Sequence, residues 1–168
     1  MNIIFDLDGT LWNSVKSVVT SYNKVLEDCP DVSYKMTEEK LRSYMGKTID
    51  EISGLFFYDL PKERGLEIID ECTKIENEYV KEHGGILFPK LEETLKKLYE
   101  KNTLFIVSNC QAGYIESFFG YSNLGKYFKD HECPGNSNLS TKAENITLLM
   151  NRNSINIEDT IYVGDTDR

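Results

Sequence analysis

An apolar run that ends abruptly in two carboxylates constrains this chain more than any other feature. Residues 3–5 are Ile, Ile and Phe, and Asp6, Asp8, Gly9 and Thr10 follow directly. A short apolar run predicts a buried strand, whose successive side chains turn to opposite faces. Where the chain bends at the end of the strand, one carboxylate can point at a ligand while the other swings over it. Gly9 allows a tight backbone and close approach. The pattern therefore predicts a carboxylate nucleophile with a second acid or base beside it.

Two simpler interpretations of the same segment are a plain Asx turn and a calcium loop. A calcium loop of the EF-hand type needs an oxygen ligand at position 10, where Thr10 is weak, and a glutamate at position 17, where Ser17 stands. The spacing excludes calcium. For the segment taken alone, the turn remains an open alternative.

Three later segments carry polar residues at comparable places. Apolar strands are predicted over 104–107 and 160–163, and a helix over 141–153. The polar residues at the strand ends and at the helix start are Ser108, Asn109, Lys142 and Asp165. Ligands bind at the carboxyl ends of the strands in open α/β sheets, so we expect these side chains to gather at one edge.

The long segment between the first two strands shows helical patterns and no strand signal. Thr48 or Asp50 is expected to cap a helix from Ile49 to Tyr58, and Pro61 opens a longer helix that ends at Gly84. The face of that longer helix is predicted to consist of Leu66, Ile69, Cys72, Ile75 and Tyr79. We expect residues 14–82 to form a helical cap, inserted into an α/β core made of residues 1–13 and 83–168.

From residue 87 onward, helical and strand patterns alternate. One of these helices is predicted to cover 111–119. Such alternation is typical of a parallel sheet with right-handed crossovers, so the predicted fold class is α/β.

Composition excludes several classes of protein. A formal net charge of -9 disfavours a nucleic acid partner, and there is no apolar run of about 18 residues. We expect a cytoplasmic protein without a membrane partner. The spacing of the cysteines does not match a zinc site; they are Cys29, Cys72, Cys110 and Cys133.

The order of carboxylate pair, serine, lysine and Gly-Asp resembles the four signature motifs of the haloacid dehalogenase (HAD) superfamily. The motif Asp6-Leu7-Asp8-Gly9-Thr10 is its most specific part. The chain looks most like the phosphoglycolate-phosphatase-like branch, in which a helical cap follows the first motif. The resemblance implies a three-layer, Rossmann-like parallel sheet with a small cap.

The resemblance also implies roles for individual residues. Asp6 would be the nucleophile that forms an aspartyl-phosphate, and Asp8 the general acid and base. Lys142 would neutralise charge on the nucleophile and the phosphoryl group. Magnesium would be held by Asp6, by Asp8 through its carbonyl, and by Asp165. The phosphate-binding groups would be the Gly9 and Thr10 backbone, Ser108, Asn109 and Lys142.

Each role has a simpler alternative. Asp6 could bind metal only, Asp8 could stabilise a turn, Lys142 could be an exposed lysine at a helix start, and Ser108 could cap the next helix. In the cap, Lys47 follows Gly46 and is the expected substrate-facing residue; a solvated turn is the alternative.

The function predicted from these roles is a magnesium-dependent phosphatase, a phosphoric monoester hydrolase, acting on a small phosphorylated metabolite. One alternative is a catalytically weak or inactive HAD-like protein that binds ligands or regulates a partner. Another is a sugar phosphomutase; those of this branch usually carry a histidine about 12 residues after the nucleophile, where Val18 stands. We expect a monomer or a weak homodimer.

The end of the chain departs from the family pattern. The fourth motif usually carries another carboxylate four residues after the first, which would be position 169, and Asp167 is not in that register. We expect the C-terminal part of the core to be missing, the strand over 160–163 to become a sheet edge, and metal binding to be weakened.

Overall fold

The centre of the molecule is a four-stranded parallel sheet in the order β5-β4-β1-β6. The computed structural model describes residues 1–165, and Asp167 lies outside them. The strands are β1 (Asn2–Phe5), β2 (Trp12–Asn13), β3 (Ile86–Leu87), β4 (Thr103–Val107), β5 (Phe128–Glu132) and β6 (Thr160–Val163). The α-helices are α1 (Val15–Glu27), α2 (Glu38–Tyr44), α3 (Ile49–Phe56), α4 (Lys62–His83), α5 (Leu91–Tyr99), α6 (Tyr114–Ser122), α7 (Pro134–Ser137) and α8 (Lys142–Asn153).

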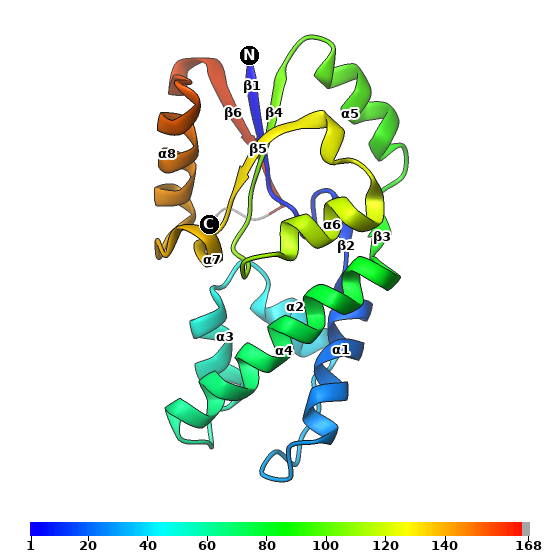
Figure 1. Cartoon of the computed structure of the whole chain (residues 1–168), viewed down its shortest axis with the longest axis vertical. Coiled ribbons are helices and arrows are strands. Elements are labelled where there is room, and N and C mark those ends of the chain that lie inside the picture. Colours follow the sequence, from blue (N-terminus) through cyan, green and yellow to red (C-terminus); the bar gives the residue numbers. More distant parts are fainter. Residues whose placement is uncertain (166–168) are drawn as a thin grey trace.

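Side-chain alternation along the strands builds the three expected layers. Ile3 and Phe5 of β1 belong to the larger core cluster, together with Leu95 of α5 and Phe118 of α6. Ile4 points to the opposite face, where a smaller cluster includes Phe105, Val107 and Leu149 of α8. Helices therefore cover both faces of the sheet, as Figure 1 shows. The predicted α/β three-layer fold is confirmed.

The register of the strands places the polar segments side by side at one edge of the sheet. Phe5 of β1 lies opposite Ile106 of β4 and Val163 of β6, and the Asp6 N–H donates to the Val163 carbonyl at 2.8 Å. Because these three strands are parallel, their carboxyl ends meet at the same edge of the sheet. Asp6, Ser108 and Asp165 follow these ends.

A short two-stranded ribbon joins the helical segment to the core, and the sequence patterns did not predict it. Trp12 of β2 pairs antiparallel with Leu87 of β3, and Asn13 pairs with Ile86. Helices α1 to α4 lie between these two strands in sequence and gather below the sheet in Figure 1. Trp12 is fully buried, and the centroid of its ring lies 4.9 Å from that of the Phe118 ring in an edge-to-face contact. The ribbon thus joins the two connections of the helical segment, and Trp12 packs it against α6.

The helix boundaries follow local capping chemistry. Thr48 caps α3 in a capping box with Glu51, which decides between the two expected caps, Thr48 and Asp50. Helix α6 begins at Tyr114, later than expected, because Gly113 takes the left-handed conformation with φ of 86°.

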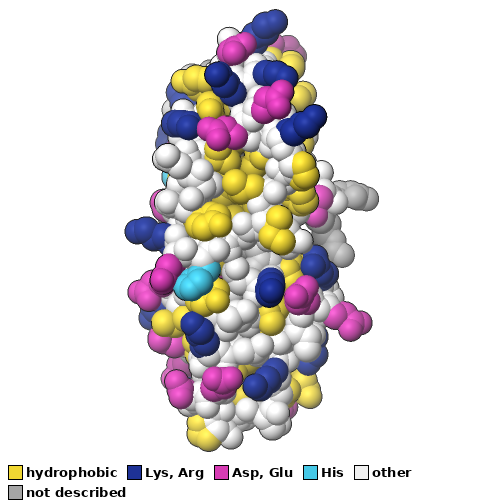
Figure 2. All heavy atoms as spheres, turned by 90° about the vertical axis from the view of Figure 1, so that its right-hand side faces the viewer, with side chains coloured by type: hydrophobic (Ala, Val, Ile, Leu, Met, Phe, Trp, Pro, Cys, Tyr) yellow, Lys and Arg dark blue, Asp and Glu magenta, His cyan; other side chains and the backbone are white. Residues whose placement is uncertain are grey.

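The surface shows mixed charge and one partly uncovered strand. Within the described residues, β6 pairs with β1 alone, and Ile161, Tyr162 and Val163 are 43%, 37% and 37% exposed. Figure 2 shows hydrophobic side chains gathered at mid-height on one face, with charges of both signs interspersed above and below. In residues 1–165, no helix has the length and apolarity that crossing a membrane requires.

Candidate active site

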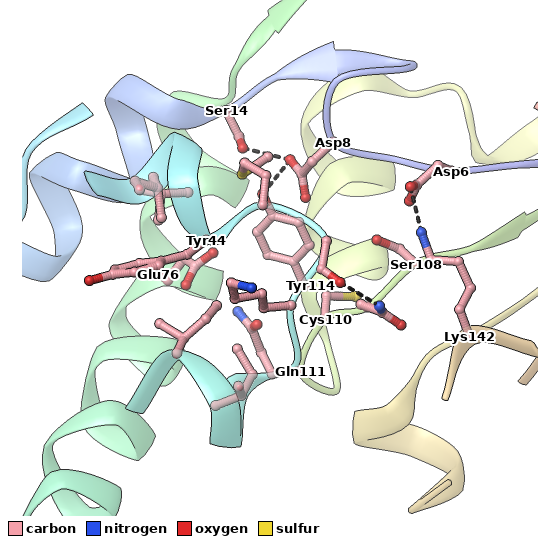
Figure 3. A pocket seen from close by; sticks show the side chains of 18 of the residues that line it. Asp6, Asp8, Ser14, Tyr44, Glu76, Ser108, Cys110, Gln111, Tyr114 and Lys142 are labelled. Carbon is pink, nitrogen blue, oxygen red and sulfur yellow. Dashed lines mark hydrogen bonds and ion pairs between the residues drawn. The ribbon is translucent and has the colours of Figure 1, made fainter. Parts of the chain in front are cut away.

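A cavity of about 70 Å³ lies between the carboxyl ends of the strands and the helical segment α1 to α4 (Figure 3). Residues of the core form one side of it: Asp6, Asp8, Ser108, Asn109, Lys142 and Asp165. Residues of the helical segment form the other, and they include Tyr22, Tyr44, Lys47 and Glu76. Residues separated by more than one hundred positions in sequence therefore share one cavity.

The core side is organised around an ion pair. The Lys142 ammonium lies 2.5 Å from an Asp6 carboxylate oxygen, and both side chains are 8% exposed. Lys142 also donates to the Tyr162 hydroxyl at 3.0 Å. Burial lowers the pKa of Lys142, but the charge of Asp6 and its hydrogen bond raise it more, so its pKa lies above the ordinary value. A buried lysine facing the first motif is not the exposed lysine of the simpler alternative.

Asp8 is held by three donors that converge on one oxygen. Its Oδ1 accepts from Trp12 Nε1 at 2.9 Å, from Ser14 Oγ at 2.6 Å and from the Tyr114 hydroxyl at 3.0 Å. Burial and, to a smaller extent, the charge of Asp6 raise the pKa of Asp8, and the three hydrogen bonds lower it, which leaves the pKa at about 6. A carboxyl with a pKa near 6 can both give and take a proton close to neutral pH, which suits a general acid and base.

The expected phosphate-binding groups are only partly brought together. Ser108 is buried and lines the cavity; it does not cap α6, whose N-cap is Gly113. Gly9 and Thr10 do not line the cavity, and their N–H groups donate to the carbonyls of Trp12 at 2.9 Å and Leu7 at 3.3 Å. The loop therefore uses these two N–H groups internally.

Asn109 lines the cavity in an orientation that the sequence did not indicate. Its Nδ2 donates to the Gly46 carbonyl at 2.8 Å, which links the core to the helical segment. Its Oδ1 is buried and has no hydrogen-bond partner among the described residues. An acceptor left in this state costs free energy unless a ligand or water satisfies it.

The expected magnesium ligands offer hard oxygens. Asp165 lines the same cavity as Asp6, and its carboxylate packs against the backbone of Gly9, where φ is 80°. Within residues 1–165, no cluster of three His, Cys, Asp or Glu side chains is poised for a metal. The prediction relies on two side chains and the Asp8 carbonyl, so it does not need such a cluster. Carboxylate and carbonyl oxygens are the donors that Mg²⁺ prefers, and the residues present fit this ion.

On the side of the cavity formed by the helical segment, one predicted and one unpredicted residue lie together. Lys47 is half-buried and lines the cavity, and its substrate-facing role stays a prediction. Glu76 of α4 was not expected here; it is 5% exposed, and its pKa is raised to about 8, mainly by burial. That value already includes the negative charge of Asp8, which raises the pKa, and the hydrogen bonds with Tyr22 and Gln111, which lower it.

Sequence reasoning missed Trp12, Ser14, Tyr114 and Glu76. The first three hold Asp8 but carry no motif. A signal for Glu76 did exist, because it stands four residues after Cys72 and seven after Ile69, on the apolar stripe of one helix.

The comparisons with known proteins agree with this geometry. A family model described as haloacid dehalogenase-like hydrolase matches residues 3–168. Phosphoglycolate phosphatases of Vibrio parahaemolyticus and Vibrio vulnificus are 26% and 27% identical to the chain, over 98% of its length and 75% of theirs.

Solved structures show the same fold. A haloacid dehalogenase-like hydrolase of Bacteroides fragilis has a TM-score of 0.83 at 23% identity, covering 98% of this chain and 78% of that one. A protein described as a phosphoglycolate phosphatase, from Haemophilus somnus, has a TM-score of 0.77 at 21% identity, covering 97% and 76%. The resemblance inferred from the four motifs is confirmed, and the chain belongs to the haloacid dehalogenase-like hydrolase family.

Proposed function

We propose that the protein is a magnesium-dependent phosphatase that hydrolyses a small phosphorylated metabolite through an aspartyl-phosphate. The observation that carries this proposal is the buried Asp6–Lys142 ion pair facing a cavity that Asp8 also lines. A carboxylate beside an ammonium, with a second carboxyl of raised pKa, is the equipment that two-step phosphoryl transfer needs. The names of the Vibrio relatives support the same reaction class.

The first step is attack by an Asp6 carboxylate oxygen on phosphorus. The P–O bond to the leaving alcohol breaks, and Asp8 donates its proton to that alkoxide. Lys142 lies against Asp6 and reduces the repulsion between the carboxylate and the phosphoryl oxygens. Ser108, buried at the end of β4, supplies a hydroxyl donor on the core side.

The second step hydrolyses the aspartyl-phosphate. Asp8 has lost its proton in the first step, so it can take a proton from a water molecule as that water attacks phosphorus. Inorganic phosphate leaves and Asp6 is regenerated. Asp6, the Asp8 carbonyl and Asp165 would hold Mg²⁺, which supplies positive charge against the anionic phosphoryl group.

Phosphate release from a panel of phosphorylated metabolites, with and without Mg²⁺, tests the proposal. We expect metal-dependent release from at least one small monoester and none with the Asp6→Asn variant. Binding of these esters without any release would favour the alternative of a HAD-like binding or regulatory protein. Conversion of one sugar phosphate isomer into another would favour the phosphomutase.

A further inference from the structure

Glu76 is the one acidic residue of α4 that is buried, and its position requires an explanation. The other acidic side chains of this helix are exposed; they are Glu63, Glu67, Asp70, Glu71, Glu78 and Glu82. Glu76 instead points into the cavity, across Tyr114 from Asp6 and Lys142 (Figure 3). It therefore occupies the end of the cavity that lies away from the proposed nucleophile.

The immediate neighbours of Glu76 do not compensate for its burial as an ion. The groups that affect it most are Asp8, the Tyr22 hydroxyl and the Gln111 amide, and none of these carries a positive charge. A buried carboxylate without a cation is costly, so stability alone does not explain the residue. Retaining a carboxyl in its neutral form leaves it able both to donate and to accept a hydrogen bond.

The surrounding polar groups have the same dual character. Gln111 is fixed by a hydrogen bond from its Nε2 to Asn77 Oδ1 at 2.9 Å, and the Asn109 Oδ1 atom is an acceptor without a partner among the described residues. On the cap side, Lys47 is the cation that lines the cavity. Lys47 suits an anionic group, whereas beside Glu76, Gln111 and Asn109 hydroxyl groups, which donate and accept, fit better than an anion does.

A second hollow of about 490 Å³ adjoins the cavity, and it is lined by carboxylates but by no cation of the described residues. It shares Ile49, Asn109, Cys110 and Gln111 with the first, and Asp50 and Asp70 are its charged lining residues. Asp70 is paired with Lys74 at 2.6 Å. A leaving group that extends past Gln111 therefore meets amides, hydroxyls and carboxylates, together with apolar side chains such as Leu66, Ile69 and Leu139.

We propose that Glu76 is a specificity-determining residue whose carboxyl receives a hydroxyl group of the leaving alcohol. The preferred substrate is then the phosphate monoester of a small, neutral, polyhydroxy alcohol, not that of a hydroxy acid such as glycolate. The inference rests on the proposed phosphatase function. It places the leaving alcohol at the Glu76 end of the same cavity.

The first test is steady-state kinetics of the full chain with Mg²⁺ on sn-glycerol 3-phosphate and on 2-phosphoglycolate. We expect kcat/KM to be at least about tenfold higher for the glycerol ester, since mispaired buried polar groups penalise the wrong ligand. A preference for 2-phosphoglycolate, or no preference, overturns the inference even if every variant fails to fold.

Variants then test whether Glu76 sets the preference. Glu76→Met should lower the ratio of the two kcat/KM values about tenfold, mainly through a higher KM for the glycerol ester. Glu76→Gln should keep most of the preference, because an amide also donates and accepts. The matched control is Glu78→Gln on the exposed side of α4, for which the ratio should stay at the wild-type value. An unchanged ratio in a folded Glu76→Met variant contradicts the assignment.

Failure of the proposed function is distinguishable from failure of this inference. p-Nitrophenyl phosphate has no hydroxyl on its leaving group to reach Glu76, so its hydrolysis reports on phosphatase chemistry alone. If neither it nor the two esters are hydrolysed, calorimetric titration of the chain with the same two esters still decides the specificity. Tighter binding of sn-glycerol 3-phosphate supports the role of Glu76, and equal or weaker binding refutes it.

Discussion

The ammonium of Lys142 lies 2.5 Å from the carboxylate of Asp6, although 136 positions separate the two residues in sequence. Asp6 follows the central strand β1 and Lys142 opens α8, so the contact joins the sheet to the helix layer on one of its faces. Because both side chains are buried, neither charge is well solvated without the other. The pair is therefore important for stability as well as for the proposed chemistry.

Asp6→Asn is expected to lower turnover to less than about one per cent of wild type, because an amide cannot serve as the nucleophile of a two-step transfer. The measurement is phosphate release from p-nitrophenyl phosphate with Mg²⁺. Asp31→Asn, which removes an exposed carboxylate far from the cavity, serves as the matched control. Substantial activity in Asp6→Asn would rule out the aspartyl-phosphate.

The Asp6–Lys142 ion pair can be tested by a double-mutant cycle of unfolding free energies. Lys142→Met leaves Asp6 buried without its cation and should lower the free energy of unfolding by about 3–5 kcal/mol, with Asp6→Asn lowering it by a smaller amount. The double variant should be more stable than Lys142→Met alone, since no unpaired charge remains. Urea denaturation of the four proteins without metal measures this coupling. Additive losses would mean that the two side chains are energetically independent.

Gly9→Ala is expected to weaken metal binding and activity. A Cβ at this position would overlap the Asp165 carboxylate, and the backbone φ of 80° is unfavourable for alanine. Relief requires Asp165 to move away from the first-motif loop. Calorimetric titration with Mg²⁺ should show affinity at least about tenfold lower. Gly54→Ala on α3 is the control, because a Cβ added there would meet open space. Unchanged Mg²⁺ affinity in Gly9→Ala would argue against Asp165 as a ligand.

Metal removal should abolish turnover, and added Mg²⁺ should restore it. Ca²⁺ should inhibit, because it takes more ligands at longer distances and would disturb in-line attack. Beryllium fluoride, which mimics the phosphoryl group on a carboxylate, should raise Tm in the presence of Mg²⁺ and leave the Tm of Asp6→Asn unchanged. Activity that persists after exhaustive chelation contradicts this prediction.

Strand ends and helix caps were predictable because their signals are local. The apolar runs predicted β1, β4 and β6, and Thr48 was one of the two expected caps of α3. The β2–β3 ribbon was not predictable in this way, since each strand has only two residues and each needs its partner across the inserted helices. Similarly, α6 begins later than predicted because Gly113 adopts a left-handed conformation, and the spacing of apolar residues does not reveal such a conformation.

The candidate site shows the same division. Motif residues such as Lys142 were identified because their order along the chain matches the family's order of motifs. Tyr114 and Glu76 were missed because their roles depend on how α6 and α4 pack. The predicted face of α4 included Ile75 and Tyr79, which are half-buried, whereas Glu76 and Val80 are buried. The burial of one glutamate is set by the neighbouring helices, and a single helical pattern does not contain that information.

Burial of Glu76 also predicts a pH dependence of stability. Its pKa is raised from 4.5 to about 8, so between these values the native state binds more protons than the unfolded chain. This contribution to stability is fully present below about pH 4.5 and is lost as the pH rises through about 8. Asp8, Tyr22 and Cys72 also face this region and have raised pKa values, so comparison with a variant is needed to isolate Glu76.

Glu76→Gln removes the ionisation but keeps the shape, so its stability should fall less steeply with pH than that of wild type. The difference in unfolding free energy between the variant and wild type should shift in favour of the variant by about 2–4 kcal/mol from about pH 5 to about pH 9. This range is smaller than the full pKa shift would give, because the site relaxes when Glu76 ionises. Urea denaturation at both pH values, without metal or phosphate, gives this difference, and Glu78→Gln should follow the wild-type slope. If the unfolding free energy of Glu76→Gln changes with pH as steeply as that of wild type, Glu76 is ionised and solvated at neutral pH. The assignment of a neutral carboxyl to the leaving-group end of the cavity is then wrong.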